Sequence, residues 1–160
     1  MLTSITHRHT GVDVLRLPGL SDVPSRYVHR AREQFGPHAH SVNAALTFVR
    51  DHLMAWSMRD KIAVASTVTN VFVENALSYT RSGFDIRLEG STDEVVVAVS
   101  DASPNLAVRR DRPLGGYPGG LDIVSALCQR WGNAATATGK TVWARIGADD
   151  RLGGITGLLH

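Results

Sequence analysis

The sequence predicts an α+β fold, a two-layer sandwich with helices on one face of a mixed, mainly antiparallel sheet. Two observations carry this prediction. Apolar residues recur at helical spacing over about 42–56 and 60–79, and they alternate with polar residues over about 84–88. Val95, Val97 and Val99 likewise recur at every second position over about 95–99. Helices and strands that come in separate runs are typical of one layer of each. The 160 residues are enough for one domain with a sizeable core.

The composition is that of an ordinary globular protein, with 43% hydrophobic and 20% charged residues. A formal net charge of +2 gives little support for nucleic-acid binding. The single cysteine, Cys128, excludes an internal disulfide and fits a reducing cytosol. No apolar run reaches the ~20 residues that span a bilayer, and the N-terminus lacks the apolar core of a signal peptide. We therefore expect a soluble, cytoplasmic protein with no membrane partner and no direct nucleic-acid partner.

Three parts of the chain differ in pattern. Residues 1–40 predict an N-terminal arm, with a short strand at 12–17 and a helix at 24–35 that begins at a proline. The segment "GPHAHS" then breaks the pattern, and residues 41–148 form the main domain. Residues 149–160 are rich in glycine and predict a loosely ordered tail.

The main domain continues from its two long helices into a hairpin, whose turn is "EGSTDE" at 89–94. Residues 103–118 contain several prolines and glycines, and such a long irregular connection is typical of a functional lid or a disordered loop. A third helix is expected over about 120–131. Two last strands are expected to pair across a turn at Gly139 and Lys140.

Short motifs occur in a fixed order along the second half of the chain. They are "VENALSYT" at 73–80, "VSDASPNL" at 99–106, "GGYPGGLDIVSALCQRWG" at 115–132, and "GK" followed by "TVWARI" at 139–146. Their order resembles the nucleotide-binding domain shared by gyrases, sensor histidine kinases and MutL, in the small form of the bacterial anti-sigma-factor serine kinases. The resemblance covers roughly residues 41–147. Its most specific parts are Asp101-Ala102-Ser103-Pro104, Arg130-Trp131-Gly132 and Gly139-Lys140-Thr141-Val142-Trp143.

The resemblance implies that the chain binds ATP or ADP together with Mg²⁺. It implies a nucleotide site formed by Asn75, Asp101, Ser103, Gly119, Gly120, Leu121, Gly139 and Thr141. Asp101 would lie at the pocket floor and accept a hydrogen bond from the exocyclic amine of adenine, which guanine replaces with a carbonyl. The alternative for Asp101 is a structural one, a turn-forming residue before Ser-Pro.

Gly119, Gly120 and Leu121 open the third predicted helix. Glycines let the backbone approach a phosphate, and the first N–H groups of a helix attract anions. The alternative is a flexible connector. The related family usually has Gly-x-Gly-Leu here, whereas this chain has Pro118 at the first glycine position, which removes one N–H donor.

Two asparagines compete for the metal-holding position on the second long helix. Asn75 lies at the border of the apolar face, and Asn70 lies on the polar face. A residue that holds a ligand should lie where the helix meets the pocket, so we assign the metal to Asn75. A solvated helix asparagine is the alternative for either residue.

The general base of the family is a glutamate four residues before that asparagine, and this chain has Val71 there. In the register of Asn70 the position is Ser66. Neither side chain can serve as the base that takes the proton of an attacking hydroxyl. Glu74 is the remaining candidate, but it points about a quarter-turn away from Asn75, and a solvated surface acid is its alternative interpretation.

The arginines Arg109, Arg110 and Arg112 cluster in the predicted lid, where they could meet a γ-phosphate or an acidic partner, or simply be solvated. The resemblance places Gly139 and Thr141 near adenine, with a plain hairpin turn as the alternative. The histidines occur in loops without a set of carboxylate or cysteine partners, which argues against a metal site made of histidines.

These observations lead to a hypothesis about function. We expect an ATP-binding regulator of anti-sigma-factor type that controls a sigma factor or its antagonist by binding it, with weak or lost serine kinase activity. The alternative is an active serine/threonine-protein kinase that phosphorylates an anti-anti-sigma factor. A homodimer is compatible with either hypothesis. A DNA-linked role of the N-terminal arm is disfavoured by the low net charge.

Overall fold

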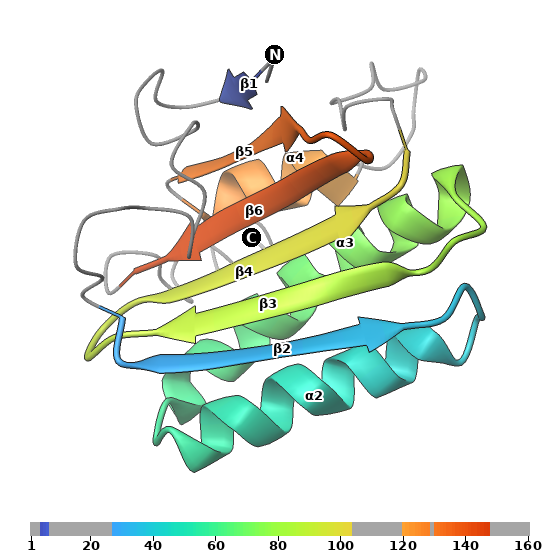
Figure 1. Ribbon diagram of the computed structural model, residues 1–160. Helices are drawn as coiled ribbons and strands as arrows, with labels where there is room; N and C mark the ends of the chain where they lie inside the picture. Colours follow the sequence, from blue (N-terminus) through green and yellow to red (C-terminus); the bar gives the residue numbers. More distant parts are fainter. Residues whose placement is uncertain (1–3, 7–26, 104–119, 129, 148–160) are drawn as a thin grey trace, which may run out of the picture.

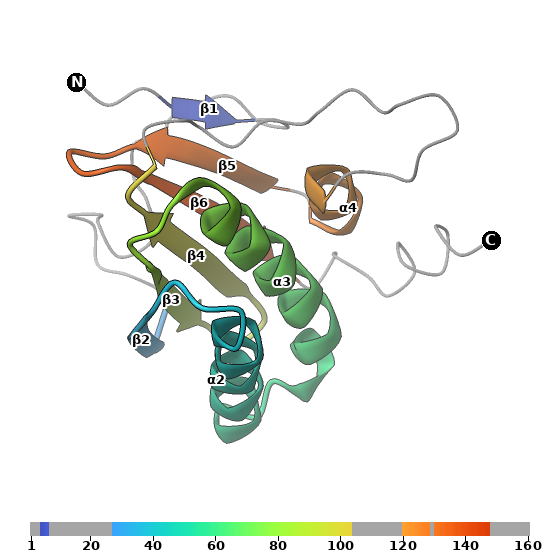
Figure 2. The same ribbon diagram turned by 90° about the vertical axis from the view of Figure 1, so that its right-hand side faces the viewer.

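The structure is a computed structural model, and it describes residues 4–6, 27–103, 120–128 and 130–147. Helices and strands form two layers, with all three helices on one side of the sheet (Figures 1 and 2). The helices are α2 (Ser41–Ala55), α3 (Ile62–Tyr79) and α4 (Gly120–Leu127), and a 3₁₀ turn, η1 (Arg59–Lys61), precedes α3. The strands are β1 (Ser4–Thr6), β2 (His29–Phe35), β3 (Phe84–Gly90), β4 (Val95–Asp101), β5 (Arg130–Ala135) and β6 (Lys140–Ile146).

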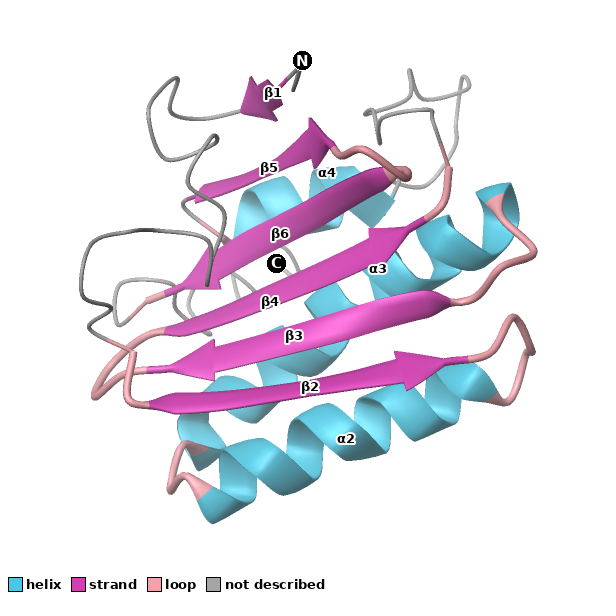
Figure 3. Ribbon diagram, in the orientation of Figure 1, coloured by secondary structure: helices cyan, strands magenta, loops and turns pink. Residues whose placement is uncertain are grey.

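The six strands form one sheet in the order β1-β5-β6-β4-β3-β2 (Figure 3). Every pairing between described strands is antiparallel. The prediction of an α+β sandwich with helices on one face is confirmed. The two hairpins, β3–β4 and β5–β6, also form as expected.

The core lies between the helices and the sheet. Alternate residues of β4, from Val95 to Val99, face α3 and are at most 1% exposed. The helices contribute apolar residues at helical spacing to the same cluster, among them Phe48 of α2 and Phe72 of α3. Because side chains alternate along a strand, the residues in between point to the opposite face of the sheet. There Ala98, Ala134 and Trp143 form a second, smaller cluster.

The helix predicted at 24–35 is wrong, because residues 29–35 form the strand β2. β2 pairs with β3 over its whole length, from His29 opposite Gly90 to Phe35 opposite Phe84. The physical reason is a period-2 pattern: Ala31 and Phe35 pack against the helix-side core, whereas Arg30 and Arg32 occupy the opposite face. β2, which belongs to the predicted N-terminal arm, is the edge strand of this sheet.

The helix predicted over 120–131 is too long. α4 ends at Leu127, and Arg130 begins β5. Trp131 pairs with Ala144 of β6 and is 0% exposed, so burial in the sheet outweighs continuation of the helix. The strand predicted at 12–17, most of the loop at 103–118 and the tail at 149–160 lie outside the described residues.

The face opposite the helices carries a group of charged side chains. Glu89 of β3 lies there, with its carboxylate 3.2 Å from Arg30 Nε and its side chain 1% exposed. Neither carboxylate oxygen has a hydrogen-bond partner among the described residues. Burial therefore raises the pKa of Glu89 above 4.5, and the nearby arginines only partly oppose this shift.

We predict that Glu89→Gln reduces the pH dependence of stability above pH 4.5. The folded protein keeps the Glu89 proton at pH values where the unfolded chain has lost it, so the free energy of unfolding falls as pH rises through this window. Urea denaturation at several pH values from 4.5 to neutral measures the effect. Glu33→Gln, at an exposed position of β2, is the matched control. An unchanged pH slope in Glu89→Gln would contradict the prediction.

Candidate functional site

Predicted site residues outside α4 come from three elements that meet at one end of the sandwich. These are the C-terminal half of α3, the end of β4 and the start of β6, which lie together on the right-hand side of Figure 1. α3 packs directly on β4 and against α4. Residues separated by more than sixty positions in the sequence therefore share one region.

Asp101 is the last residue of β4 and faces the helix layer, as Val97 and Val99 do. Its carboxylate has two internal partners. Lys140 Nζ lies 2.9 Å from Oδ2 and donates to Oδ1 at 3.1 Å. The backbone N–H of Ser103 donates to Oδ1 at 2.8 Å, which forms the turn expected from the structural interpretation of Asp101. Ser103 itself is 1% exposed.

A close approach between the backbone at Gly139 and the end of β4 requires glycine at this position. A Cβ atom at this position would lie 1.9 Å from the carbonyl oxygen of Asp101 and 2.6 Å from Cα of Ala102. The turn between β5 and β6 closes with a hydrogen bond from Thr136 N to Gly139 O. Backbone packing against the end of β4 is thus sufficient to explain the glycine.

Thr141 does not lie beside Asp101. It points to the opposite face of the sheet, where its Oγ1 is 2.7 Å from Oγ of Ser100. The residue opposite Asp101 in the ladder is Lys140, which sequence reasoning did not include in the site. The signal was present in the alternation of β6, because Lys140 has the same parity as the buried, helix-facing Val142.

Asn75 lies on α3 and is half-buried. Its side-chain oxygen Oδ1 is fully buried and has no hydrogen-bond partner among the described residues. A buried acceptor without a donor is costly, and a bound cation or hydrogen-bond donor would remove that cost. Asn70 and Ser66, in the alternative register, are also half-buried, and Glu74 is exposed.

Val71 precedes Asn75 by one helical turn and contacts the start of α4. A Cβ atom at Gly120 would lie 2.8 Å from Cγ1 of Val71, so the glycine lets α4 begin directly against α3. Leu121, the next residue, is buried in the core. Val71, where the resemblance would place a general base, therefore contacts Gly120, the first residue of α4.

Several predicted residues cannot be placed. Gly119, Pro118 and the lid arginines Arg109, Arg110 and Arg112 lie outside the described residues. Among the residues that the structure describes, no group of three or more His, Cys, Asp or Glu side chains could hold a metal ion. Within the same ranges, no helix has the length and apolar character needed to cross a membrane.

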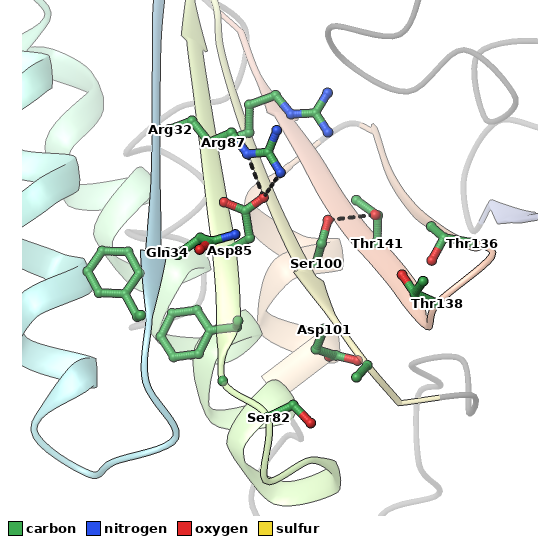
Figure 4. A pocket seen from close by; sticks show the side chains of 14 residues that line it. Arg32, Gln34, Ser82, Asp85, Arg87, Ser100, Asp101, Thr136, Thr138 and Thr141 are labelled. Carbon is green, nitrogen blue, oxygen red and sulfur yellow. Dashed lines mark hydrogen bonds and ion pairs between the residues drawn. The ribbon is translucent and has the colours of Figure 1, made fainter.

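A groove of about 490 Å³ lies on the face of the sheet opposite the helices (Figure 4). Polar and charged side chains line it together with Phe35 and Phe84. Arg32 donates from Nε to Oδ2 of Asp85 at 2.7 Å, and this contact raises the pKa of Arg32. Partial burial lowers the pKa of Arg87. The groove also reaches Ser100, Asp101, Ala102 and Thr141 at the end of β4 and the start of β6.

No known protein-family model matches the chain, and no curated protein matches its sequence. The resemblance to the nucleotide-binding family therefore rests on the sequence motifs alone.

We predict that Gly139→Ala lowers the free energy of unfolding by roughly 1–3 kcal/mol, because the added methyl group forces the turn away from β4. Gly147→Ala is the matched control, since a Cβ atom there would have its nearest neighbour, Glu94, at 3.8 Å. Urea denaturation of both variants gives the comparison. Equal stability of Gly139→Ala and the parent protein would show that the turn adapts without cost.

Proposed function

We propose that this chain is an adenine-nucleotide-binding regulatory protein of the anti-sigma-factor type. It would bind ATP or ADP with Mg²⁺ between α3, the end of β4 and the start of α4. It would control a sigma factor, or the anti-anti-sigma protein that opposes it, by binding that partner. Phosphoryl transfer to a serine would be very slow or absent.

The observation that carries the proposal is the buried Oδ1 of Asn75, which has no hydrogen-bond partner among the described residues. It lies one helical turn from Val71, which contacts the first residue of α4. Mg²⁺ prefers oxygen ligands, and helix N-termini favour anions such as phosphates. An amide oxygen one helical turn from the contact with the start of α4 therefore fits a nucleotide phosphate and its cation.

The residues have distinct roles in this proposal. Asn75 would hold Mg²⁺, which neutralises charge on the phosphate oxygens when bound. The backbone N–H groups at the start of α4 would approach a phosphate, since Gly120 carries no side chain of its own. Asp101 would accept from the amino group of adenine, in competition with its internal partners Lys140 and Ser103.

The weak or absent kinase activity follows from Val71. Its side chain packs on Gly120 and supplies no acceptor for the proton of an attacking hydroxyl. Glu74, the other candidate base, is exposed on the outer side of α3. The sequence thus retains residues for binding and lacks a base placed for transfer.

We predict that Asn75→Ala weakens binding of Mg-ATP by about 1.5–3 kcal/mol, because a charge-assisted contact is lost. This corresponds to roughly tenfold or more in the dissociation constant. Isothermal titration calorimetry with ATP and ADP, each with and without Mg²⁺, measures the change. Asn70→Ala is the matched control on the same helix. A larger loss of affinity in Asn70→Ala than in Asn75→Ala would show that Asn70, and not Asn75, holds the metal.

We predict that Val71→Glu raises serine phosphorylation above the level of the parent protein, by a factor on the order of 10² if the new carboxylate acts as a base. Transfer of ³²P from ATP to a serine-bearing anti-anti-sigma protein gives the rate. Val71→Gln is the matched control, because it has the same shape and no basic carboxylate. Fast transfer by the parent protein that is abolished in Glu74→Gln would instead identify Glu74 as the base and favour the active kinase.

A further inference from the structure

The ion pair between Lys140 and Asp101 is withdrawn from solvent on both sides. The Lys140 side chain is 0% exposed and that of Asp101 is 2% exposed. Lys140 Nζ lies within 3.1 Å of both carboxylate oxygens, and Ser103 N occupies a further position on Oδ1. Three close polar contacts thus converge on the carboxylate that the proposed function assigns to adenine.

A buried carboxylate with an ammonium partner is a different acceptor from a bare one. The ammonium neutralises its charge, and a charge-assisted hydrogen bond is stronger than one from a neutral amine. The amino group of adenine is a neutral donor, so it cannot displace Lys140 on equal terms. Removing the cation would also leave a buried charge without compensation, which is strongly unfavourable.

The strand pairing, and not only the rotamer of the lysine, places Lys140 beside Asp101. Asp101 and Lys140 are opposite each other in the β4–β6 ladder, and both face the helix layer. Gly139 holds the start of β6 against the end of β4, because its missing side chain allows the close backbone contact. The ammonium is therefore held at the carboxylate before any ligand arrives.

We propose that Lys140 determines the affinity and the base selectivity of this chain for nucleotides, by competing as an internal cation for the Asp101 carboxylate. This inference rests on the proposed function, since it assumes that Asp101 meets the base. While Lys140 occupies the carboxylate, the exocyclic amine of adenine contributes little to binding. When Lys140 is replaced by a neutral residue, the amine becomes the best available donor to Asp101.

The test compares two ligands in the full-length protein: ATP, and purine riboside triphosphate, which lacks the 6-amino group. Calorimetry in the presence of Mg²⁺ gives both dissociation constants for the parent protein and for Lys140→Met. We expect Lys140→Met to bind ATP at least about tenfold more tightly than the parent protein does, while the affinity for purine riboside triphosphate stays within about twofold. The ratio between the two ligands is the readout that a purely structural lysine would not move.

Three further variants keep the test decisive. Lys140→Leu is a second variant with neither a cation nor a donor at this position, and it replaces Lys140→Met in the test if Lys140→Met unfolds. Lys140→Arg retains the cation and should keep the low selectivity of the parent protein. Lys61→Met removes another buried lysine, which donates to Gly147 O and lies outside the site. It should change the dissociation constant of neither ligand.

The outcomes separate this inference from the proposed function. If the parent protein binds ATP and a folded neutral variant binds it equally or more weakly, the competition is refuted while nucleotide binding stands. If the parent protein does not bind ATP and a neutral variant does, the competition is supported in its strongest form. If neither binds, with folding verified by circular dichroism, both the proposed function and the role of Lys140 are overturned.

Discussion

The antiparallel register between β4 and β6 is the constraint on which the candidate site depends. It places Lys140 opposite Asp101, and it turns Thr141 to the other face of the sheet. The register is held by the contact of Gly139 with the backbone of Asp101 and Ala102, which only glycine permits. A shift by one residue would exchange the faces of every side chain in β6 and would bury Arg145 against the helices.

The two faces of the sheet have different chemistry, because the described helices all pack on one of them. On the helix side, apolar residues surround the ion pair between Asp101 and Lys140 at the end of β4. On the other side, arginines and carboxylates line β2 and β3, and hydroxyl groups line the ends of β4 and β6. Asp101 lies at the boundary of both environments, since its carboxylate belongs to the first and its neighbour Ser100 to the second.

The sequence was sufficient to predict the elements with strong apolar periodicity. It was insufficient where the pairing of strands determines the secondary structure or the neighbours of a residue. The apolar spacing of α2 and α3, the alternation in β3 and the apolar run of β4 could be recognised directly in the sequence. β2 was mistaken for a helix because its alternation, with Arg30 and Arg32 on one face and Ala31 and Phe35 on the other, emerges only when β3 is alongside. Lys140 was overlooked for a similar reason, because cross-strand neighbours depend on the register of a hairpin whose closing contact is a backbone approach.

The contact of Val71 with Gly120 links two segments that are far apart in the chain. The two positions share one space in the core, so a larger side chain at one position clashes with the residue at the other. A larger residue at position 120 would require a smaller one at position 71, and a longer residue at position 71 would push the start of α4 outward. Any longer side chain that adds a new chemical group at position 71 would therefore also shift the first turn of α4.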